Sequence, residues 1–131
     1  MAVATSSSGE RFRMKTAHHR GLFDKVFDVI VTGDDVTNSK PHPEMFEKAA
    51  RLVSEKRSLT PAPPGDILVF EDAVMGVQAG LRAGMKVVMV NSMMENGPPS
   101  EEGSRPHQFL TSMEDFQPDS WGLPGFNTSQ I

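Results

Sequence analysis

Three separate stretches of this sequence carry side chains that could together bind a phosphate group and a divalent cation. Hydroxyl groups crowd into Thr5, Ser6 and Ser7, one ammonium group stands at Lys40 among prolines, and two carboxyl groups are adjacent at Glu71 and Asp72. Each stretch follows a short apolar run. The three groups are therefore candidates for one site, provided that the fold brings the ends of these runs together.

The first apolar run ends in the hydroxyl-rich stretch Thr5-Ser6-Ser7-Ser8-Gly9, directly before a predicted helix. A helix N-terminus presents unsatisfied backbone N–H donors and the positive end of the helix dipole, and both favour a bound anion. Serine and threonine are also the ordinary residues that cap a helix, so capping alone is the competing interpretation.

Lys40 is followed by Pro41, His42 and Pro43. The two prolines are expected to push Lys40 and His42 toward extended conformations and to place Pro43 at the first turn of a helix. An ammonium group on a stiff loop is a compact charge that suits a phosphoryl group. The alternative is a lysine in a turn, surrounded by solvent.

Glu71 and Asp72 directly follow the apolar residues 67–70. Mg²⁺ prefers oxygen ligands and is commonly held by one or two carboxylates together with a substrate phosphate. Acidic residues at the start of a helix are also stabilised by the helix dipole, so a purely structural role stands beside metal binding.

The elements that must position these groups follow from the apolar pattern. Strands are predicted at residues 1–5, 29–32, 67–70 and 87–90, with a short edge strand at 108–111, and helices at 9–19, 43–55 and 74–83. Strands that alternate with helices predict a doubly wound α/β fold with a parallel sheet. Ligands of such sheets bind at the carboxyl ends of the strands, where all three stretches lie.

Two further patterns concern packing and surface charge. Gly76, Gly80 and Gly84 share one face of the third predicted helix, which indicates close approach to the sheet or to a neighbouring element. The basic stretch of Arg11, Arg13, Lys15 and Arg20 lacks interleaved aromatic residues and is interpreted as a solvated face. The tail over residues 116–126 is expected to pack onto the body of the protein.

The composition limits the classes of function. The 131 residues are predicted to form one domain, with flexible loops at residues 58–66 and 96–106, and 23% are charged and 37% hydrophobic. A net charge of −4 argues against a general nucleic-acid binder. The absence of cysteine excludes disulfides, zinc–thiolate sites and thiol nucleophiles within these residues.

The distribution of apolar residues bears on whether the protein binds a membrane and in which compartment it is expected. No apolar run reaches the roughly 18 to 20 residues that span a bilayer, so we expect no membrane partner and a cytoplasmic location. Residues 1–21 are rich in Ser, Arg, Lys and His with Glu10 as their only acid. Mitochondrial transit peptides share this composition, and that alternative stays open.

Taken in order, the motifs resemble those of capped phosphatases of the haloacid dehalogenase superfamily, with pseudouridine-5'-phosphatases the most similar. Glycerol-phosphate phosphatases and β-phosphoglucomutases are similar enough that the substrate stays open. The resemblance covers nearly the whole chain. The residues that carry it are Ala4-Thr5-Ser6-Ser7, Gly33-Asp34-Asp35, Ser39-Lys40-Pro41-His42-Pro43, Val69-Phe70-Glu71-Asp72-Ala73, Gly76-Val77-Gln78-Ala79-Gly80, Ala83-Gly84-Met85, Asp115-Phe116-Gln117-Pro118 and Trp121-Gly122-Leu123-Pro124.

The resemblance implies a role for each candidate residue. Thr5 would bind the transferring phosphoryl group with the backbone N–H of Ser6, and Lys40 would neutralise its charge. Glu71 and Asp72 would hold Mg²⁺. The substrate would be a small phosphomonoester, such as a nucleotide or sugar phosphate. The family reaction passes through an aspartyl-phosphate formed on the first aspartate of an Asp-x-Asp motif, with the second as acid and base.

The sequence departs from that pattern in two respects. No two acidic residues recur with Asp-x-Asp spacing, and the segment that would form the family's helical cap is missing. We therefore expect a partial Rossmann-like sheet that lacks the first strand and the cap, with Met1 an internal methionine of a longer protein. Unpaired strand edges predict an unstable or aggregation-prone chain, and cooperative melting of a monomer above ~60 °C would contradict this.

Three functional hypotheses follow. The first is a phosphatase of which this chain alone is inactive. On this hypothesis the chain hydrolyses an aryl phosphate in an EDTA-sensitive reaction no faster than a Lys40→Ala variant does. The second is a pseudoenzyme or interaction protein that keeps phosphate and Mg²⁺ binding without turnover. The third is a receiver-type signalling domain, but there the acids come first and the lysine last, whereas here the hydroxyl leads.

Overall fold

Within residues 1–126, which the computed structural model describes, five strands form two parallel sheets. In one sheet β1 (Ala2–Ala4) pairs with β2 (Val29–Val31). The other has the order β3 (Leu68–Glu71), β4 (Lys86–Val90) and β5 (Gln108–Leu110). These bounds confirm the predicted strands to within one residue at each end. The short, Val-rich segments suit strands that are covered on both faces.

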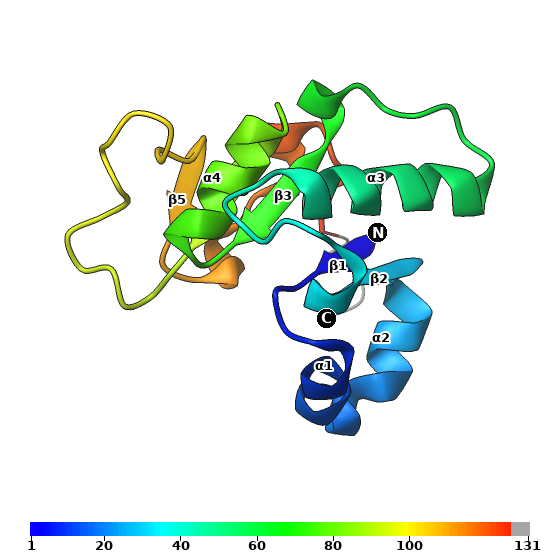
Figure 1. The fold of residues 1–131 in the computed structure, drawn as a ribbon. Helices are drawn as coiled ribbons and strands as arrows, with labels where there is room; N and C mark the ends of the chain where they lie inside the picture. Colours follow the sequence, from blue (N-terminus) through cyan, green and yellow to red (C-terminus); the bar gives the residue numbers. More distant parts are fainter. Residues whose placement is uncertain (127–131) are drawn as a thin grey trace.

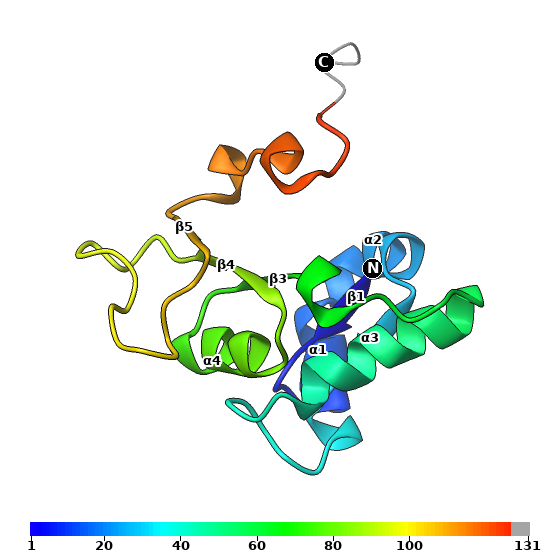
Figure 2. The same cartoon turned by 90° about the horizontal axis from the view of Figure 1, so that it is seen from above.

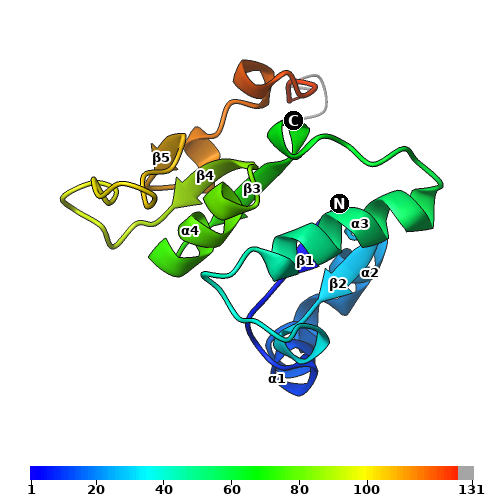
Figure 3. The same cartoon turned by 45° about the horizontal axis from the view of Figure 1, so that its top comes forward.

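Helices cover both faces of the β1–β2 sheet, and one helix and the C-terminal tail cover the two faces of the β3–β4–β5 sheet. Helix α3 (Glu44–Arg57) packs on β1 and β2, and α4 (Val74–Arg82) packs on β3 and β4 (Figure 1). Helices α1 (Gly9–Lys15) and α2 (Arg20–Val26) lie on the other side of the β1–β2 pair (Figure 2). The first sheet and its helices sit beside the second, and α3 contacts α4 (Figure 3). The α/β class with a partial parallel sheet is thus confirmed.

The core of the larger sheet centres on β4. Val87, Val88 and Met89 of this strand have no exposed surface. The tail covers the face opposite α4, where the rings of Phe70 and Phe116 meet edge to face at 4.8 Å. The indole N–H of Trp121 also donates to the side chain of Gln108 at 2.8 Å. The prediction that the tail packs onto the body is confirmed for Phe116 and Trp121, whereas Leu123 and Phe126 are exposed.

The helix predicted over residues 9–19 is wrong in its extent. Helix α1 ends at Lys15, a 3₁₀ turn (Ala17–His19) follows, and α2 was not predicted. At this break the carbonyl of Phe12 accepts both from the backbone N–H of Thr16 at 3.0 Å and from its hydroxyl at 2.9 Å. Helix α2 depends on packing, because the ring of Phe23 lies 5.5 Å from that of Phe12 and 5.4 Å from that of Phe27.

Gly80 explains the close approach of α4 to the sheet, as the spacing predicted, whereas Gly84 lies beyond the end of α4 with a φ of 74°. A Cβ atom on Gly80 would lie 2.7 Å from Cγ2 of Val87 and 3.6 Å from Cγ1 of Val69. Alanine at this position therefore cannot fit unless the helix moves away from β4. The usual advantage of alanine over glycine in a helix, about 1 kcal/mol, is lost to overpacking.

We expect Gly80→Ala to lower the free energy of unfolding by about 1 to 3 kcal/mol, measured from the urea midpoint. Gly21→Ala in α2 is the matched control, because nothing lies within 4 Å of a Cβ atom at Gly21. The control variant should be as stable as the wild type or more stable. A Gly80→Ala variant with the stability of the Gly21→Ala variant would contradict the close packing.

The two loops predicted to be flexible lie away from the candidate residues. The end of the second loop is anchored, because Ser104 is only 1% exposed and its hydroxyl accepts from Nε2 of Gln78 at 2.8 Å. Flexibility of the remainder stays a prediction. Among the described residues, no helix is long and apolar enough to cross a bilayer.

Candidate functional site

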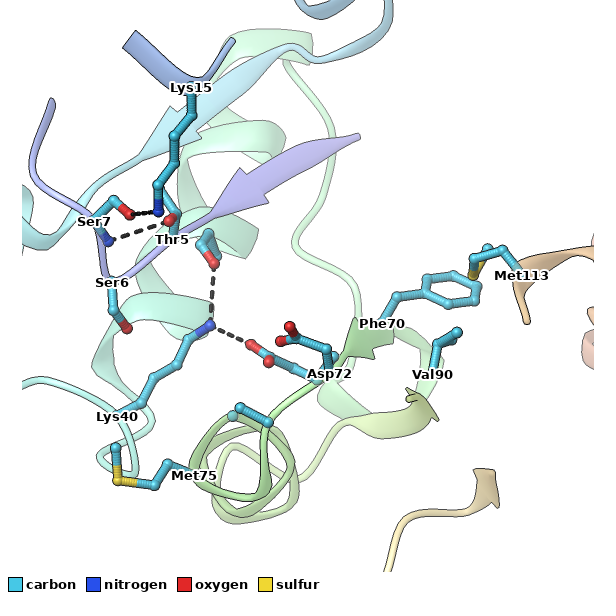
Figure 4. A pocket seen from close by; sticks show the side chains of 14 residues that line it. Thr5, Ser6, Ser7, Lys15, Lys40, Phe70, Asp72, Met75, Val90 and Met113 are labelled. Carbon is cyan, nitrogen blue, oxygen red and sulfur yellow. Dashed lines mark hydrogen bonds and ion pairs between the residues drawn. The ribbon is translucent and has the colours of Figure 1, made fainter. Parts of the chain in front are cut away.

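An open cavity of about 670 Å³ lies between the two sheets, at the carboxyl ends of their strands (Figure 4). Its lining includes all five predicted site residues: Thr5, Ser6, Lys40, Glu71 and Asp72. In the described part of the chain, β1 and β3 each pair with a single neighbouring strand. The separation of the two sheets therefore creates the cavity, and the topology brings three distant stretches to its edge.

The turn after β1 is prepared to donate hydrogen bonds into the cavity. The hydroxyl oxygen of Thr5 accepts from the backbone N–H of Ser7 at 3.2 Å, so its own hydrogen stays available for a ligand. No described residue accepts a hydrogen bond from the backbone N–H of Ser6. Ser8, in contrast, is the cap of α1, and its hydroxyl accepts from the N–H of Arg11. The competing interpretation, helix capping, is therefore confirmed for Ser8, whereas Thr5, Ser6 and Ser7 do not cap α1.

A second turn after β2 supports the hydroxyl-rich turn. The N–H of Gly33 donates to the carbonyl of Ser7 at 2.8 Å, and a Cβ atom on Gly33 would lie 2.6 Å from the carbonyl oxygen of Ser6. Asp34 accepts from the N–H of Gly9 at 2.8 Å. The pKa of Asp35 is held below its usual value by hydrogen bonds from the backbone N–H and hydroxyl of Thr32. The Gly33-Asp34-Asp35 motif therefore fixes the backbone around the candidate anion site.

Lys40 lies between the two sheets with its ammonium group almost buried. Its Nζ atom donates to the carbonyl oxygen of Ala4 at 3.1 Å and forms an ion pair with Oε1 of Glu71. The lysine and glutamate side chains are only 10% and 8% exposed. The ammonium also lies 4.7 Å from the ring centroid of Phe46. Lys40 is therefore held by contacts from both sheets, unlike a lysine in a solvated turn.

The loop that carries Lys40 is a turn rather than the predicted extended segment. The N–H of His42 donates to the carbonyl of Ser39 at 3.0 Å, which closes the turn. The carboxylate of Glu44 accepts from the backbone N–H groups of Thr37 and Asn38 at 2.8 and 2.9 Å. The bond from Thr37, followed by those from the side-chain amide and backbone N–H of Asn38, holds the pKa of Glu44 below its usual value, so the carboxylate stays ionised as an acceptor.

Glu71 fits into a space that only glycine leaves open. A Cβ atom on Gly76 would lie 2.0 Å from the carboxyl carbon of Glu71. The first glycine of the α4 face thus makes room for the carboxylate that pairs with Lys40. The sequence predicted close approach of this helix to a neighbour, but the neighbour at Gly76 is a candidate site residue.

Asp72 is exposed at the rim of the cavity, and its main chain is fixed by a residue that the sequence reasoning missed. The side-chain amide of Asn91 donates to the carbonyl of Asp72 at 2.9 Å, while its oxygen accepts from the N–H of Met93 at 2.9 Å. Asn91 directly follows β4. The rule that ligand-binding groups follow strands could have found it, since the carboxyl ends of β3 and β4 adjoin.

Lys15 is the second residue that the sequence reasoning missed. The sequence analysis assigned it to a solvated basic face, and its side chain is indeed exposed. Lys15 nevertheless lines the cavity, and its Nζ atom donates to the hydroxyl of Ser7 at 3.0 Å (Figure 4). Its position in the last turn of α1 was the available signal, because helical side chains lean toward the helix N-terminus.

Comparison with known proteins places this architecture in a family. The family model for the haloacid dehalogenase-like hydrolase matches residues 1–90, which is more than half of the chain. This range includes β1, which Thr5 follows, and β3, which ends at Glu71. The chain belongs to the haloacid dehalogenase-like hydrolases. The resemblance stated from the motifs is therefore confirmed at the level of the family.

Individual members of the haloacid dehalogenase-like hydrolases resemble the chain closely. It is 42% identical to a probable pseudouridine-5'-phosphatase of Drosophila melanogaster, over 95% of this chain and 51% of the relative. It is 39% identical to the mitochondrial (DL)-glycerol-3-phosphatase 1 of Arabidopsis thaliana, over 98% of this chain and 41% of the relative. The chain thus spans about half the length of these relatives or less.

A solved structure of this haloacid dehalogenase-like family has the same fold. The CbbY protein of Rhodobacter sphaeroides, crystallised in complex with phosphate, superposes with a TM-score of 0.66 at 27% identity. The match covers 85% of this chain and 45% of that protein. The similarity therefore extends over most of the described sheets and helices.

Proposed function

We propose that this chain forms the phosphate- and magnesium-binding part of a phosphomonoester phosphatase. The observation that carries the proposal is that three distant stretches of the chain line the same cavity. They contribute Thr5, Ser6, Lys40, Glu71 and Asp72. A hydroxyl, a free backbone N–H, an ammonium and two carboxylates are the groups that would bind a phosphate dianion with a hard cation.

Each group has a role in this proposal. The hydroxyl of Thr5 and the N–H of Ser6 donate to the phosphoryl oxygens. Two of the three N–H donors of Lys40 are held by Ala4 and Glu71, so the third is available for the phosphate. Existing hydrogen bonds already hold these donor groups in position before the substrate binds. The donors therefore need no reorganisation when charge develops on the phosphoryl group, which is how such sites stabilise a transition state.

Magnesium fits the donor set in part. Asp72 and Glu71 line the cavity with carboxylate oxygens, which are the ligands that Mg²⁺ prefers. Among the described residues, no group of three His, Asp or Glu side chains could hold a metal ion by itself. This agrees with an ion that keeps several waters and takes further oxygens from the substrate. When bound there, the cation would neutralise charge on the phosphate.

The nucleophile in this proposal comes from outside the 131 residues. No Asp-x-Asp pair occurs among them, and the acids that line the cavity are Glu71 and Asp72, which we assign to the cation. The chain is therefore proposed to be inactive alone. A pseudoenzyme that binds phosphate without turnover is the alternative.

The proposed substrate class is inferred from the names of the related proteins. Their names indicate pseudouridine phosphate and glycerol phosphate, and the solved relative contains phosphate. We propose a small phosphomonoester of this kind, a nucleotide-like or sugar phosphate.

Calorimetric titration with inorganic phosphate in the presence of MgCl₂ tests the proposal. We expect saturable uptake that disappears without Mg²⁺ and falls at least about 10-fold in Asp72→Asn, because the cation loses a carboxylate ligand. Asp66→Asn is the matched control, since Asp66 is exposed and lies outside the cavity. Absence of uptake by the wild type, or equal uptake by the two variants, would contradict the proposed function.

A further inference from the structure

Lys15 occupies a position that neither the basic stretch nor the five predicted site residues explains. Its Nζ atom donates to the hydroxyl of Ser7, within the same turn that presents the hydroxyl of Thr5 and the N–H of Ser6. Figure 4 shows its ammonium group beside Ser7 and Thr5, with Lys40 on the other side of the turn. The turn is thus flanked by two ammonium groups from different elements.

The geometry of α1 delivers Lys15 to this turn. Lys15 is the last residue of the helix, and Ser8 is its N-cap, so Ser7 directly precedes the helix start. Side chains of a helix lean toward its N-terminus, and the turn before α1 lies close enough for Nζ of Lys15 to reach the hydroxyl of Ser7 at 3.0 Å. The basic residue is therefore directed back along α1, toward the cavity.

Among the side chains that line the cavity, the two ammonium groups differ in how their charges are balanced. Lys40 is paired with Glu71, so its positive charge is already balanced by a carboxylate. Asp72 adds a further negative charge to the lining, whereas no ion pair within residues 1–126 involves Lys15. A phosphomonoester carries about −1.5 to −2 charges at neutral pH. Lys15 is the lining cation whose charge is not balanced by an acid within the structure described.

We propose that Lys15 is a second cationic ligand of the substrate phosphate, acting from the side of the hydroxyl-rich turn. The proposal rests on the proposed function of the same cavity. Lys15 either gives up its bond with Ser7 for one with a phosphoryl oxygen, or keeps that bond and donates one of its two remaining N–H groups to the phosphoryl oxygen. Lys40 and Lys15 then hold the phosphate from opposite sides of the turn.

Phosphate affinity of charge-altered variants tests this role. With inorganic phosphate and MgCl₂ as the probe, Lys15→Met should weaken binding about 10-fold, while Lys15→Arg should stay within about 2-fold of the wild type. The loss of affinity on adding salt should also be smaller in Lys15→Met, because one screened charge is gone. Lys25→Met in α2 is the matched control, since Lys25 is also exposed and lies outside the cavity.

A role limited to holding Ser7 in place predicts different results. Ser7→Ala removes the hydrogen bond but keeps the ammonium, so it should retain most of the affinity if Lys15 binds phosphate. Equal affinity of Lys15→Met and Lys25→Met, with normal uptake by the wild type, overturns this assignment alone. Failure of the wild type to take up phosphate overturns the assignment together with the proposed function. Thermal melting of each variant shows whether a loss of affinity is a loss of folding.

Discussion

Replacing Lys40 with methionine should lower the free energy of unfolding by about 3 kcal/mol, because Glu71 is left as an almost buried carboxylate without a partner. Lys40 also donates to the carbonyl of Ala4, so the same change removes a link between the two sheets. Urea unfolding followed by circular dichroism measures the effect. If the wild type has less than that margin, the variant will already be unfolded without urea.

Two controls separate the ion pair from a general effect of losing a lysine. Lys25→Met removes an exposed lysine and should change the stability by less than about 0.5 kcal/mol. The double variant Lys40→Met with Glu71→Leu removes both charges, and it should regain most of the lost stability. A Lys40→Met variant as stable as Lys25→Met would show that the pair does not hold the two sheets together.

The second large effect concerns turnover. We expect the 131-residue chain to show no EDTA-sensitive hydrolysis of an aryl phosphate, and we expect hydrolysis once an N-terminal segment of a family member, with its Asp-x-Asp motif and cap, is joined to it. The gain should be at least about 10³-fold, since the joined protein acquires both a nucleophile and an acid–base group. Release of the phenol, followed by absorbance with and without EDTA, measures it.

Variants of the joined protein show whether the gain comes from the proposed chemistry. Asparagine in place of the first aspartate of the added motif should return the rate to that of the chain alone. Asp72→Asn should also reduce it strongly, whereas Asp66→Asn should not. The idea fails if the 131-residue chain by itself turns over the aryl phosphate well above a Lys40→Ala variant.

Much of the fold could be predicted from short-range patterns. Val-rich runs followed by polar residues identified the strands to within one residue, because buried parallel strands need unbroken apolar segments. Helices α3 and α4 have an apolar face and clear ends, and they too were predicted closely. Helix α2 was missed because its seven residues are held by aromatic contacts with α1, which sequence periodicity does not contain.

For the candidate site, too, the sequence predicted the residue types, and the packing of the chain decided their arrangement. The types and order of Thr5, Lys40, Glu71 and Asp72 were enough to nominate them, since hydroxyl, ammonium and carboxylate groups at strand ends suit a phosphate with a cation. Their convergence on one cavity depends on how the two sheets sit against each other. That arrangement is a property of the packed chain.

The sequence by itself therefore nominated Thr5, Ser6, Lys40, Glu71 and Asp72 as candidates for a phosphate and cation site, and the tertiary structure decided how they are connected and added Lys15 to them. Only the fold pairs Lys40 with Glu71, seats that carboxylate against Gly76 and turns Lys15 back to Ser7. The physical reason is that charge balance and steric fit depend on distances between atoms from different elements. Residues far apart along the chain acquire those distances only when the helices and sheets pack.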